Sequence, residues 1–138
     1  MAAADPREVA PVCPELFVPD VGAAIDFYTG KLGFTLYRVD PPGEPGPASE
    51  FAILTLGRAV VMFAKDDLYA AMGGSTESPR GVAIDVRIMV DDADAMYNRC
   101  RESGVQIVYD IADRYYGLRD FVITDLNGFR LRFAAPLR

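Results

Sequence analysis

The sequence predicts an α+β protein made of two modules that share the order strand, helix, strand, strand, strand. Val18-Pro19-Asp20 and Val90-Asp91-Asp92 introduce the two predicted helices and lie 72 positions apart, and Gly33 and Gly104, which end these helices, lie 71 apart. In both modules the helix is followed by strand-like runs, and the last two runs of the chain form a hairpin. One unit present twice accounts for this spacing better than chance does.

The first module is expected over residues 11–72. Its first strand, over 12–18, contains Pro14, which favours a sheet edge because proline has no amide hydrogen to donate. Asp20 is a typical N-cap for the helix that follows, which ends at Gly33. The apolar stripe of this helix consists of Val21, Ile25, Tyr28 and Leu32. The other expected elements are strands over 34–39, 50–56 and 59–64, a loop rich in proline and glycine over 40–49, and a short helix over 66–72.

A linker over 73–81 leads to the second module, over 82–135. Its first strand, over 82–90, places Ile84, Val86, Ile88 and Val90 on one face, and Asp85, Arg87 and Met89 on the other. Asp91 or Asp92 caps a helix that ends at Gly104, and a strand over 105–111 follows. The helix stripes place Tyr28 and Tyr97 in the core.

The closing hairpin begins with Arg119 and Asp120, a charged pair in the sequence. Strands over 121–124 and 129–133 flank a turn built by Asp125, Asn127 and Gly128. In the last strand Phe129, Leu131 and Phe133 alternate with Arg130 and Arg132, so one face is apolar and the other carries guanidinium groups. From the alternation alone, the arginine face is either solvated or part of a pocket.

Composition excludes several classes of function. The chain has 20 acidic and 14 basic residues, a net charge of −6, which disfavours a nucleic-acid partner and is mildly compatible with a cationic ligand. No apolar run reaches membrane-spanning length and no signal peptide is recognisable, so we expect a cytoplasmic protein with no membrane partner. Cys13 and Cys100 form no disulfide framework or metal motif, so both thiols are expected to be reduced. Histidine is absent, which removes histidine-based catalysis and the usual imidazole metal ligands.

Several short motifs resemble the vicinal oxygen chelate superfamily in its glyoxalase/bleomycin-resistance branch. They are Phe27-Tyr28, Leu32-Gly33-Phe34, Tyr116-Gly117-Leu118-Arg119-Asp120-Phe121 and Asp125-Leu126-Asn127-Gly128. The resemblance covers the chain from about Val12 to Pro136. It implies the glyoxalase/bleomycin-resistance fold, in which two βαβββ modules curl into half-barrels around a cleft, usually in a homodimer.

Many members of that superfamily hold a divalent metal on four strands. The resemblance places these positions at Cys13, Met62, Asp85 and Arg132. Asp85 alone offers an oxygen ligand for a hard metal, and the fixed positive charge of Arg132 would repel one. We therefore expect no metal and no cofactor.

The same mapping predicts a ligand-binding cleft. Its expected lining is Cys13, Glu15, Phe17, Met62, Asp85, Arg87, Met89, Arg130 and Arg132, with Tyr115 and Tyr116 at its mouth. Because buried charges need partners, Asp85 is expected to pair with Arg132, and Glu15 with Arg87 or Arg130. These pairs either replace the lost metal as structural fasteners or leave groups that bind a polar ligand.

Individual residues keep two interpretations. Glu15 is either a general base with a raised pKa or an inert ion-paired carboxylate, and Cys13 is either a nucleophile or a small buried side chain. Tyr115 and Tyr116 either stack on a ligand or are plain surface aromatics. No catalytic residue is assigned.

The resemblance and the missing metal ligands predict a metal-free protein that binds a small organic molecule, such as an antibiotic that it sequesters. The alternative is a lyase, isomerase or dioxygenase of the same superfamily that has a non-standard metal site or none. A third possibility is a regulatory or structural dimer whose cleft is filled by its own side chains.

Overall fold

A computed structural model describes residues 10–77 and 79–138 of the chain. The chain divides into two compact units, residues 1–78 and 79–138. Each unit contains a four-stranded mixed sheet with a helix packed on one face, so the predicted α+β class with two βαβββ repeats is confirmed.

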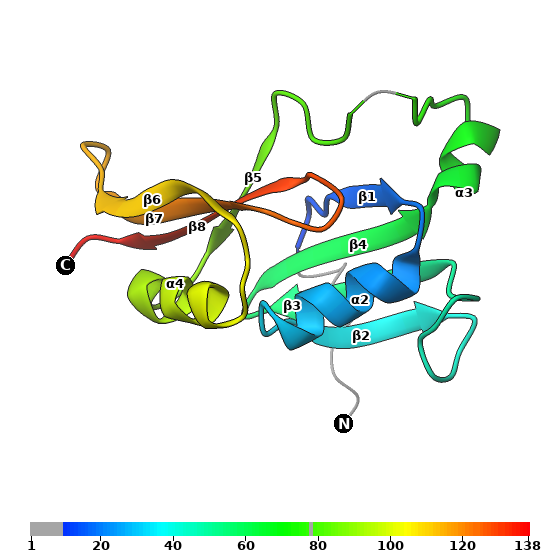
Figure 1. The fold of residues 1–138 in the computed structure, drawn as a ribbon, viewed down its shortest axis with the longest axis horizontal. Helices are drawn as coiled ribbons and strands as arrows, with labels where there is room; N and C mark the ends of the chain where they lie inside the picture. Colours follow the sequence, from blue (N-terminus) through cyan, green and yellow to red (C-terminus); the bar gives the residue numbers. More distant parts are fainter. Residues whose placement is uncertain (1–9, 78) are drawn as a thin grey trace. The chain divides into compact units, whose positions relative to one another are not determined.

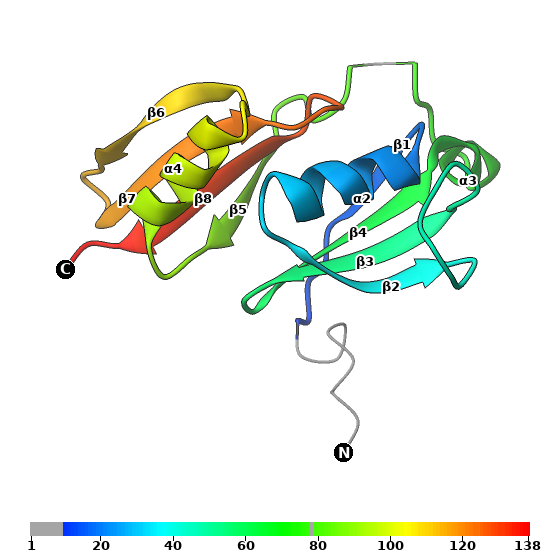
Figure 2. The same cartoon turned by 60° about the horizontal axis from the view of Figure 1, so that its bottom comes forward.

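The first unit is built on the strand order β1-β4-β3-β2. Its elements are β1 (Glu15–Val18), α2 (Val21–Gly30), β2 (Thr35–Asp40), β3 (Phe51–Leu56), β4 (Ala59–Lys65) and α3 (Asp66–Ala71). Strand β1 pairs in parallel with β4, and the other pairs are antiparallel. Helix α2 packs against β2, β3 and β4 on one face of this sheet (Figures 1 and 2).

The core of the first unit lies between α2 and the sheet. The Asp20 carboxylate accepts a hydrogen bond from the Ala23 amide at 3.0 Å, which caps the helix as predicted. All four residues of the predicted stripe are buried. The Tyr28 ring packs edge-on against Phe63 at 4.7 Å and Phe34 at 5.2 Å, which ties the helix to β4 and to the start of β2.

The second unit repeats this topology with the strand order β5-β8-β7-β6. Its elements are β5 (Asp85–Met89), α4 (Ala93–Glu102), β6 (Ile107–Asp113), β7 (Leu118–Thr124) and β8 (Arg130–Pro136). Strand β5 pairs in parallel with β8, as β1 does with β4, and α4 packs on β6, β7 and β8. Asp92, and not Asp91, caps α4, with its carboxylate 3.0 Å from the Ala95 amide. In the described part of the chain, no helix is long and apolar enough to cross a membrane.

The first strand of each unit is shorter than predicted. Strand β1 begins at Glu15, directly after Pro14, and Val12 lies outside it with 84% of its surface exposed. It forms one edge of its sheet, as Pro14 predicted. Strand β5 begins at Asp85 because Ala83, with a φ of 61°, breaks the extended conformation, so Ile84 is exposed instead of packed in the core.

Two helix predictions also need correction. Helix α2 ends at Gly30, and Gly33, with a φ of 82°, lies in the turn that leads to β2. Tyr97 is only half-buried, since its ring packs edge-on against Phe121 at 5.2 Å while its hydroxyl donates to Asp110 at 2.6 Å. A phenol can pack one edge in a core and keep its hydroxyl at the surface, and a helical stripe does not distinguish the two.

The closing hairpin forms as predicted. The Asp125 carboxylate accepts hydrogen bonds from the amides of Asn127 at 2.8 Å and Phe129 at 3.0 Å, and Gly128 adopts a φ of 92°. In β8, Leu131 and Phe133 are fully buried. The alternating arginines therefore lie on the sheet face opposite α4.

Candidate functional site

The candidate site is the face of the second sheet opposite α4, which we call the polar face. It consists of Asp85, Arg87, Tyr109, Arg114, Tyr116, Asp120, Arg130 and Arg132. Strand register brings its charged residues together, because Asp85 lies beside Arg130 and Arg87 beside Arg132 in the parallel pair β5 and β8. The period-two pattern of β5 and β8 predicted which side chains share a face, and the register of the two strands makes these residues neighbours.

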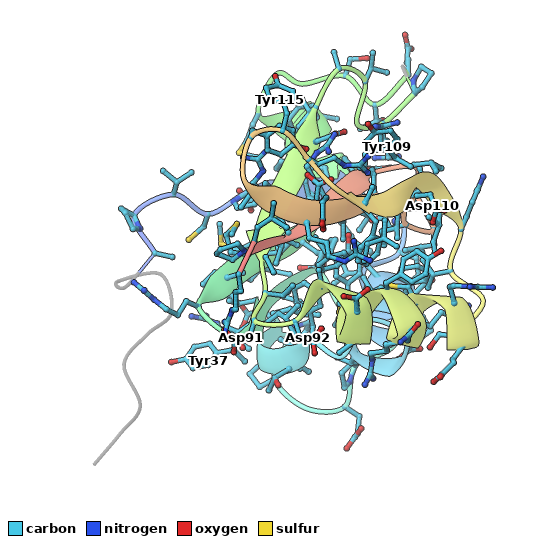
Figure 3. All side chains as sticks on the ribbon, turned by 90° about the vertical axis from the view of Figure 1, so that its left-hand side faces the viewer. Tyr37, Asp91, Asp92, Tyr109, Asp110 and Tyr115 are labelled. Carbon is cyan, nitrogen blue, oxygen red and sulfur yellow. The ribbon has the colours of Figure 1, made fainter. Side chains whose placement is uncertain are left out.

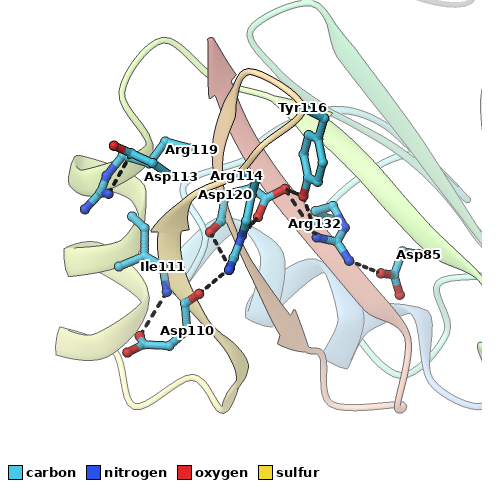
Figure 4. A network of polar contacts seen from close by, with 9 residues as sticks. All are labelled: Asp85, Asp110, Ile111, Asp113, Arg114, Tyr116, Arg119, Asp120 and Arg132. Carbon is cyan, nitrogen blue, oxygen red and sulfur yellow. Dashed lines mark hydrogen bonds and ion pairs between the residues drawn. The ribbon is translucent and has the colours of Figure 1, made fainter. Parts of the chain in front are cut away.

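Arg132 lies at the centre of the polar face between two carboxylates. One terminal nitrogen lies 2.9 Å from an Asp85 oxygen, and the other lies 3.2 Å from an Asp120 oxygen (Figure 4). Burial would lower the pKa of the guanidinium, but these hydrogen bonds outweigh it and raise the pKa. The predicted pairing of Asp85 with Arg132 is confirmed.

Asp120 is the most buried charge of the polar face, with none of its side chain exposed. Its carboxylate accepts a hydrogen bond from Arg114 Nε at 2.7 Å and a short one from the Tyr116 hydroxyl, besides the bond from Arg132. Burial alone would raise the pKa of this carboxyl, but the hydrogen bonds from Tyr116 and two guanidinium groups lower it below the ordinary value. Asp120 is thus an anchoring anion and not a proton acceptor near neutral pH.

Asp85 binds two arginines. One oxygen lies 2.6 Å from Arg130 Nε and the other lies near Arg132, so both oxygens accept from guanidinium groups. The hydrogen bond from Arg130 is the largest cause of a lowered Asp85 pKa.

The four positions at which the family resemblance places metal ligands do not fit a metal. In the second unit one position is a guanidinium and the other a carboxylate that this guanidinium binds. In the first unit the positions hold Cys13, whose thiol donates to the Ala10 carbonyl at 3.1 Å, and Met62. Hard divalent cations bind oxygen ligands and are repelled by a fixed cation, so this donor set disfavours them.

Aromatic rings flank the ion pairs. The Arg114 guanidinium lies 4.0 Å from the centre of the Tyr109 ring, and the Arg87 guanidinium lies 5.8 Å from the centre of the Tyr116 ring. Both rings remain exposed in part, at 47% for Tyr109 and 41% for Tyr116. Hydrogen bonding to Asp120 raises the Tyr116 pKa, so the phenol stays protonated at neutral pH. Tyr115, at the turn between β6 and β7, is fully exposed (Figure 3).

Arg119 and Asp120, which are adjacent in the sequence, do not pair with each other in the structure. Adjacent strand residues point to opposite faces, so Arg119 lies on the α4 side of the sheet. It binds Asp94 at 3.0 Å and Asp113 at 3.0 Å, and Figure 4 shows the pair with Asp113. An open depression of about 490 Å³ lies on that side. It is lined in part by Asp91 and Asp92 at the start of α4, which Figure 3 labels. It is separate from the polar face.

The predicted cleft residues of the first unit lie on or beside the face of its sheet opposite α2. Glu15 lies next to Met62 in the register of β1 and β4, and the Phe17 ring packs against Tyr69 of α3 at 4.4 Å. Cys13 precedes the strand. That these residues share one cleft with the polar face, and that Glu15 pairs with Arg87 or Arg130, stay predictions. The last predicted cleft residue, Met89, ends β5 and is 48% exposed.

Sequence reasoning missed three residues of the polar face. Asp120 was noted only as a charged neighbour of Arg119 in the sequence, and its place on the polar face was not predicted. Tyr109 and Arg114 lie in and just after β6, where shifts in register interrupt the period of two. A regular alternation cannot follow a strand across such irregularities.

Comparison with known proteins gives consistent results. Residues 9–133 match the family model of the Glyoxalase/Bleomycin resistance protein/Dioxygenase superfamily. An uncharacterized protein of Mycobacterium bovis is 30% identical over 129 residues, which cover 91% of this chain and 82% of that protein. The anthracycline biosynthesis protein DnrV of Streptomyces peucetius is 33% identical over 101 residues, 72% of this chain but only 37% of DnrV. The crystal structure of TioX from Micromonospora sp. ML1 superimposes with a TM-score of 0.70 at 26% identity, covering 91% of this chain and 98% of TioX.

Proposed function

Because the chain belongs to the Glyoxalase/Bleomycin resistance protein/Dioxygenase superfamily, we propose that it binds a small organic molecule on its polar face, without a metal and without chemical conversion. The observation that carries this proposal is Arg132, held by Asp85 and Asp120 at a position where the resemblance expects a metal ligand. An ion-paired guanidinium network provides orientation and hydrogen bonds, and it provides no Lewis acid.

The groups on the polar face suit binding better than catalysis. Asp85 and Asp120 have lowered pKa values and Tyr116 a raised one, so none of the three is poised to exchange a proton near neutral pH. The half-exposed rings of Tyr109 and Tyr116 offer apolar contact area next to fixed charges. Aromatic walls with a few oriented polar groups are typical of small-molecule sites.

The relatives support a ligand of the antibiotic kind. DnrV is named for anthracycline biosynthesis, and the family name includes bleomycin resistance. Sequestration of such a compound in the cytoplasm by a homodimer is the form of the proposal that we favour. The first-unit residues Cys13, Glu15, Phe17 and Met62 are part of the same proposed cleft.

A metal titration separates this proposal from an enzyme with a non-standard metal site. We expect chelator-treated protein to show no saturable thermal shift with Mn²⁺, Fe²⁺, Ni²⁺ or Zn²⁺, because ligands that bind the native state raise its apparent stability. A saturable shift that Asp85→Ala abolishes would contradict the proposal and favour a lyase, isomerase or dioxygenase.

A ligand screen tests binding directly. Titration calorimetry with anthracyclines, bleomycin-type compounds and simpler fused-ring aromatics should identify at least one compound bound with micromolar affinity or better. Tyr116→Leu should weaken this binding about tenfold, since the ring face is lost. Tyr116→Phe keeps the ring and should retain most of the affinity. If no compound binds, or if both variants bind like the parent protein, the polar face is not the site.

A further inference from the structure

The polar face carries a net positive charge although the whole chain carries −6. Its guanidinium groups belong to Arg87, Arg114, Arg130 and Arg132, and its carboxylates to Asp85 and Asp120. The neighbouring carboxylates of Asp110 and Asp113 bind Tyr97 and Arg119 instead. Within residues 79–138, four cations of this face thus meet two anions, and two positive charges remain.

The four guanidinium groups differ in how many hydrogen bonds they make to the protein. Arg132 binds two carboxylates, and Arg114 binds Asp120 and two backbone carbonyls, so both are held by the protein. Arg130 Nε donates a hydrogen bond to Asp85, and 41% of the Arg130 side chain is exposed. Within residues 79–138, no carboxylate pairs with Arg87, and its guanidinium lies over the Tyr116 ring.

Arg87 and Arg130 are diagonal neighbours in the register of β5 and β8. In the parallel pair β5 and β8, Arg87 lies beside Arg132, and Arg130 is two residues before Arg132 on the same face. Diagonal neighbours of this kind are roughly 7–8 Å apart, a distance that one carboxylate or phenolate group can bridge with hydrogen bonds to both side chains. The Tyr116 ring next to Arg87 would then contact the planar part of the same molecule.

We infer that the ligand of the polar face is a planar aromatic anion, an aromatic carboxylate or an acidic phenol, whose charge binds Arg87 and Arg130 while its ring packs on Tyr116. This inference rests on the proposed function and names the class of ligand. It reverses the expectation of a cationic ligand that the net charge of the whole chain suggested, because a ligand interacts with the charges of the face that it contacts.

Three probes that differ in charge test whether the polar face prefers an anionic ligand. We would titrate the full chain with 2-naphthoate, 2-naphthamide and 2-naphthylmethylammonium, which share one ring system, and measure affinity by calorimetry. We expect 2-naphthoate to bind about tenfold or more tightly than the other two, with a preference that weakens as salt is added. Equal affinity, or tighter binding of the ammonium compound, would overturn the inference.

Variants locate the anion. Arg87→Gln should reduce the affinity for 2-naphthoate about tenfold and leave that for 2-naphthamide unchanged. Arg119→Gln is the matched control, because it removes one guanidinium from the α4 side of the same sheet and should change neither affinity. If Arg87→Gln binds 2-naphthoate like the parent protein, the inference is wrong, and binding of neutral or cationic compounds would leave the proposed function standing. If no aromatic compound of any charge binds, the proposed function itself fails.

Discussion

The sheet faces that lie opposite the helices, which we call the open faces, have the same strand topology in the two units but carry different side chains. At matched register positions the first unit has Phe51, Ile53 and Met62 where the second has Asp120, Val122 and Arg132. Glu15 of β1 lies next to Met62, just as Arg87 of β5 lies next to Arg132. The topology of a βαβββ unit thus tolerates an apolar or an ionic open face, because helix packing on the other face forms the core. Specificity depends on the side chains of the open face.

The largest effect that we expect is the loss of stability when a core phenylalanine is removed, and it should be similar in the two units. Phe63 and Phe133 occupy matched positions on the helix-facing sides of β4 and β8, and both are fully buried. Phe63→Ala and Phe133→Ala should each lower the free energy of unfolding by about 3–5 kcal/mol, through lost burial and a remaining cavity. Urea denaturation followed by tyrosine fluorescence measures both. A cost below about 1 kcal/mol for either would show that its unit has no such core.

The buried ion pairs of the polar face should contribute more to stability than an exposed ion pair of the same unit. Asp120→Ala leaves Arg114 and Arg132 without a buried partner, so we expect a loss of about 3 kcal/mol in the free energy of unfolding. Asp113→Ala, at a carboxylate that is 63% exposed on the other side of the sheet, should cost less than about 1 kcal/mol. If the two substitutions lower the free energy of unfolding equally in urea denaturation, the ion pairs on the polar face contribute no more stability than an exposed pair does.

Acid titration should reveal a smaller effect, which is the contribution of the ionised carboxylates on the polar face to stability. Asp85 and Asp120 have folded-state pKa values below the ordinary 3.8, so their stabilising contribution is present above that pH and is lost as the pH falls below about 4. Thermal melting at steps of pH should show this loss in the parent protein. Asp85→Asn, which takes up one proton fewer on unfolding, should have a shallower acid limb.

Asp91→Asn provides the control for this titration. It removes an exposed carboxylate that precedes α4 and lies away from the polar face. Its acid limb gives the effect of removing one exposed carboxylate, with which that of Asp85→Asn is compared. An Asp85→Asn profile as steep as the parent's would show that this carboxylate does not contribute to the pH dependence.

Much of the fold could be predicted from local patterns. The N-cap Asp20, the helical stripe that contains Tyr28 and the turn at Asp125 each act within a few residues of chain, so the sequence shows them directly. For the second helix the sequence left Asp91 and Asp92 open, and the structure has Asp92. The ends of the first strands could not be predicted in this way. Ile84 has a strand-forming side chain, but it lies beside Ala83, whose positive φ interrupts the extended backbone. Val12 has one too, but it lies outside β1, which begins after Pro14.

The sequence by itself determined the repeated βαβββ order and the two faces of β8, because these follow from periodicity. The pairing of Asp85 with Arg132 was expected only from the family resemblance. Only the tertiary structure decided that Asp120 binds Arg114 and Arg132 rather than Arg119, and that Tyr109 and Tyr116 flank these ions. The physical reason is distance along the chain. Strand periodicity fixes the direction of a side chain, whereas the partner that it meets depends on register shifts and turns that bring separate segments together.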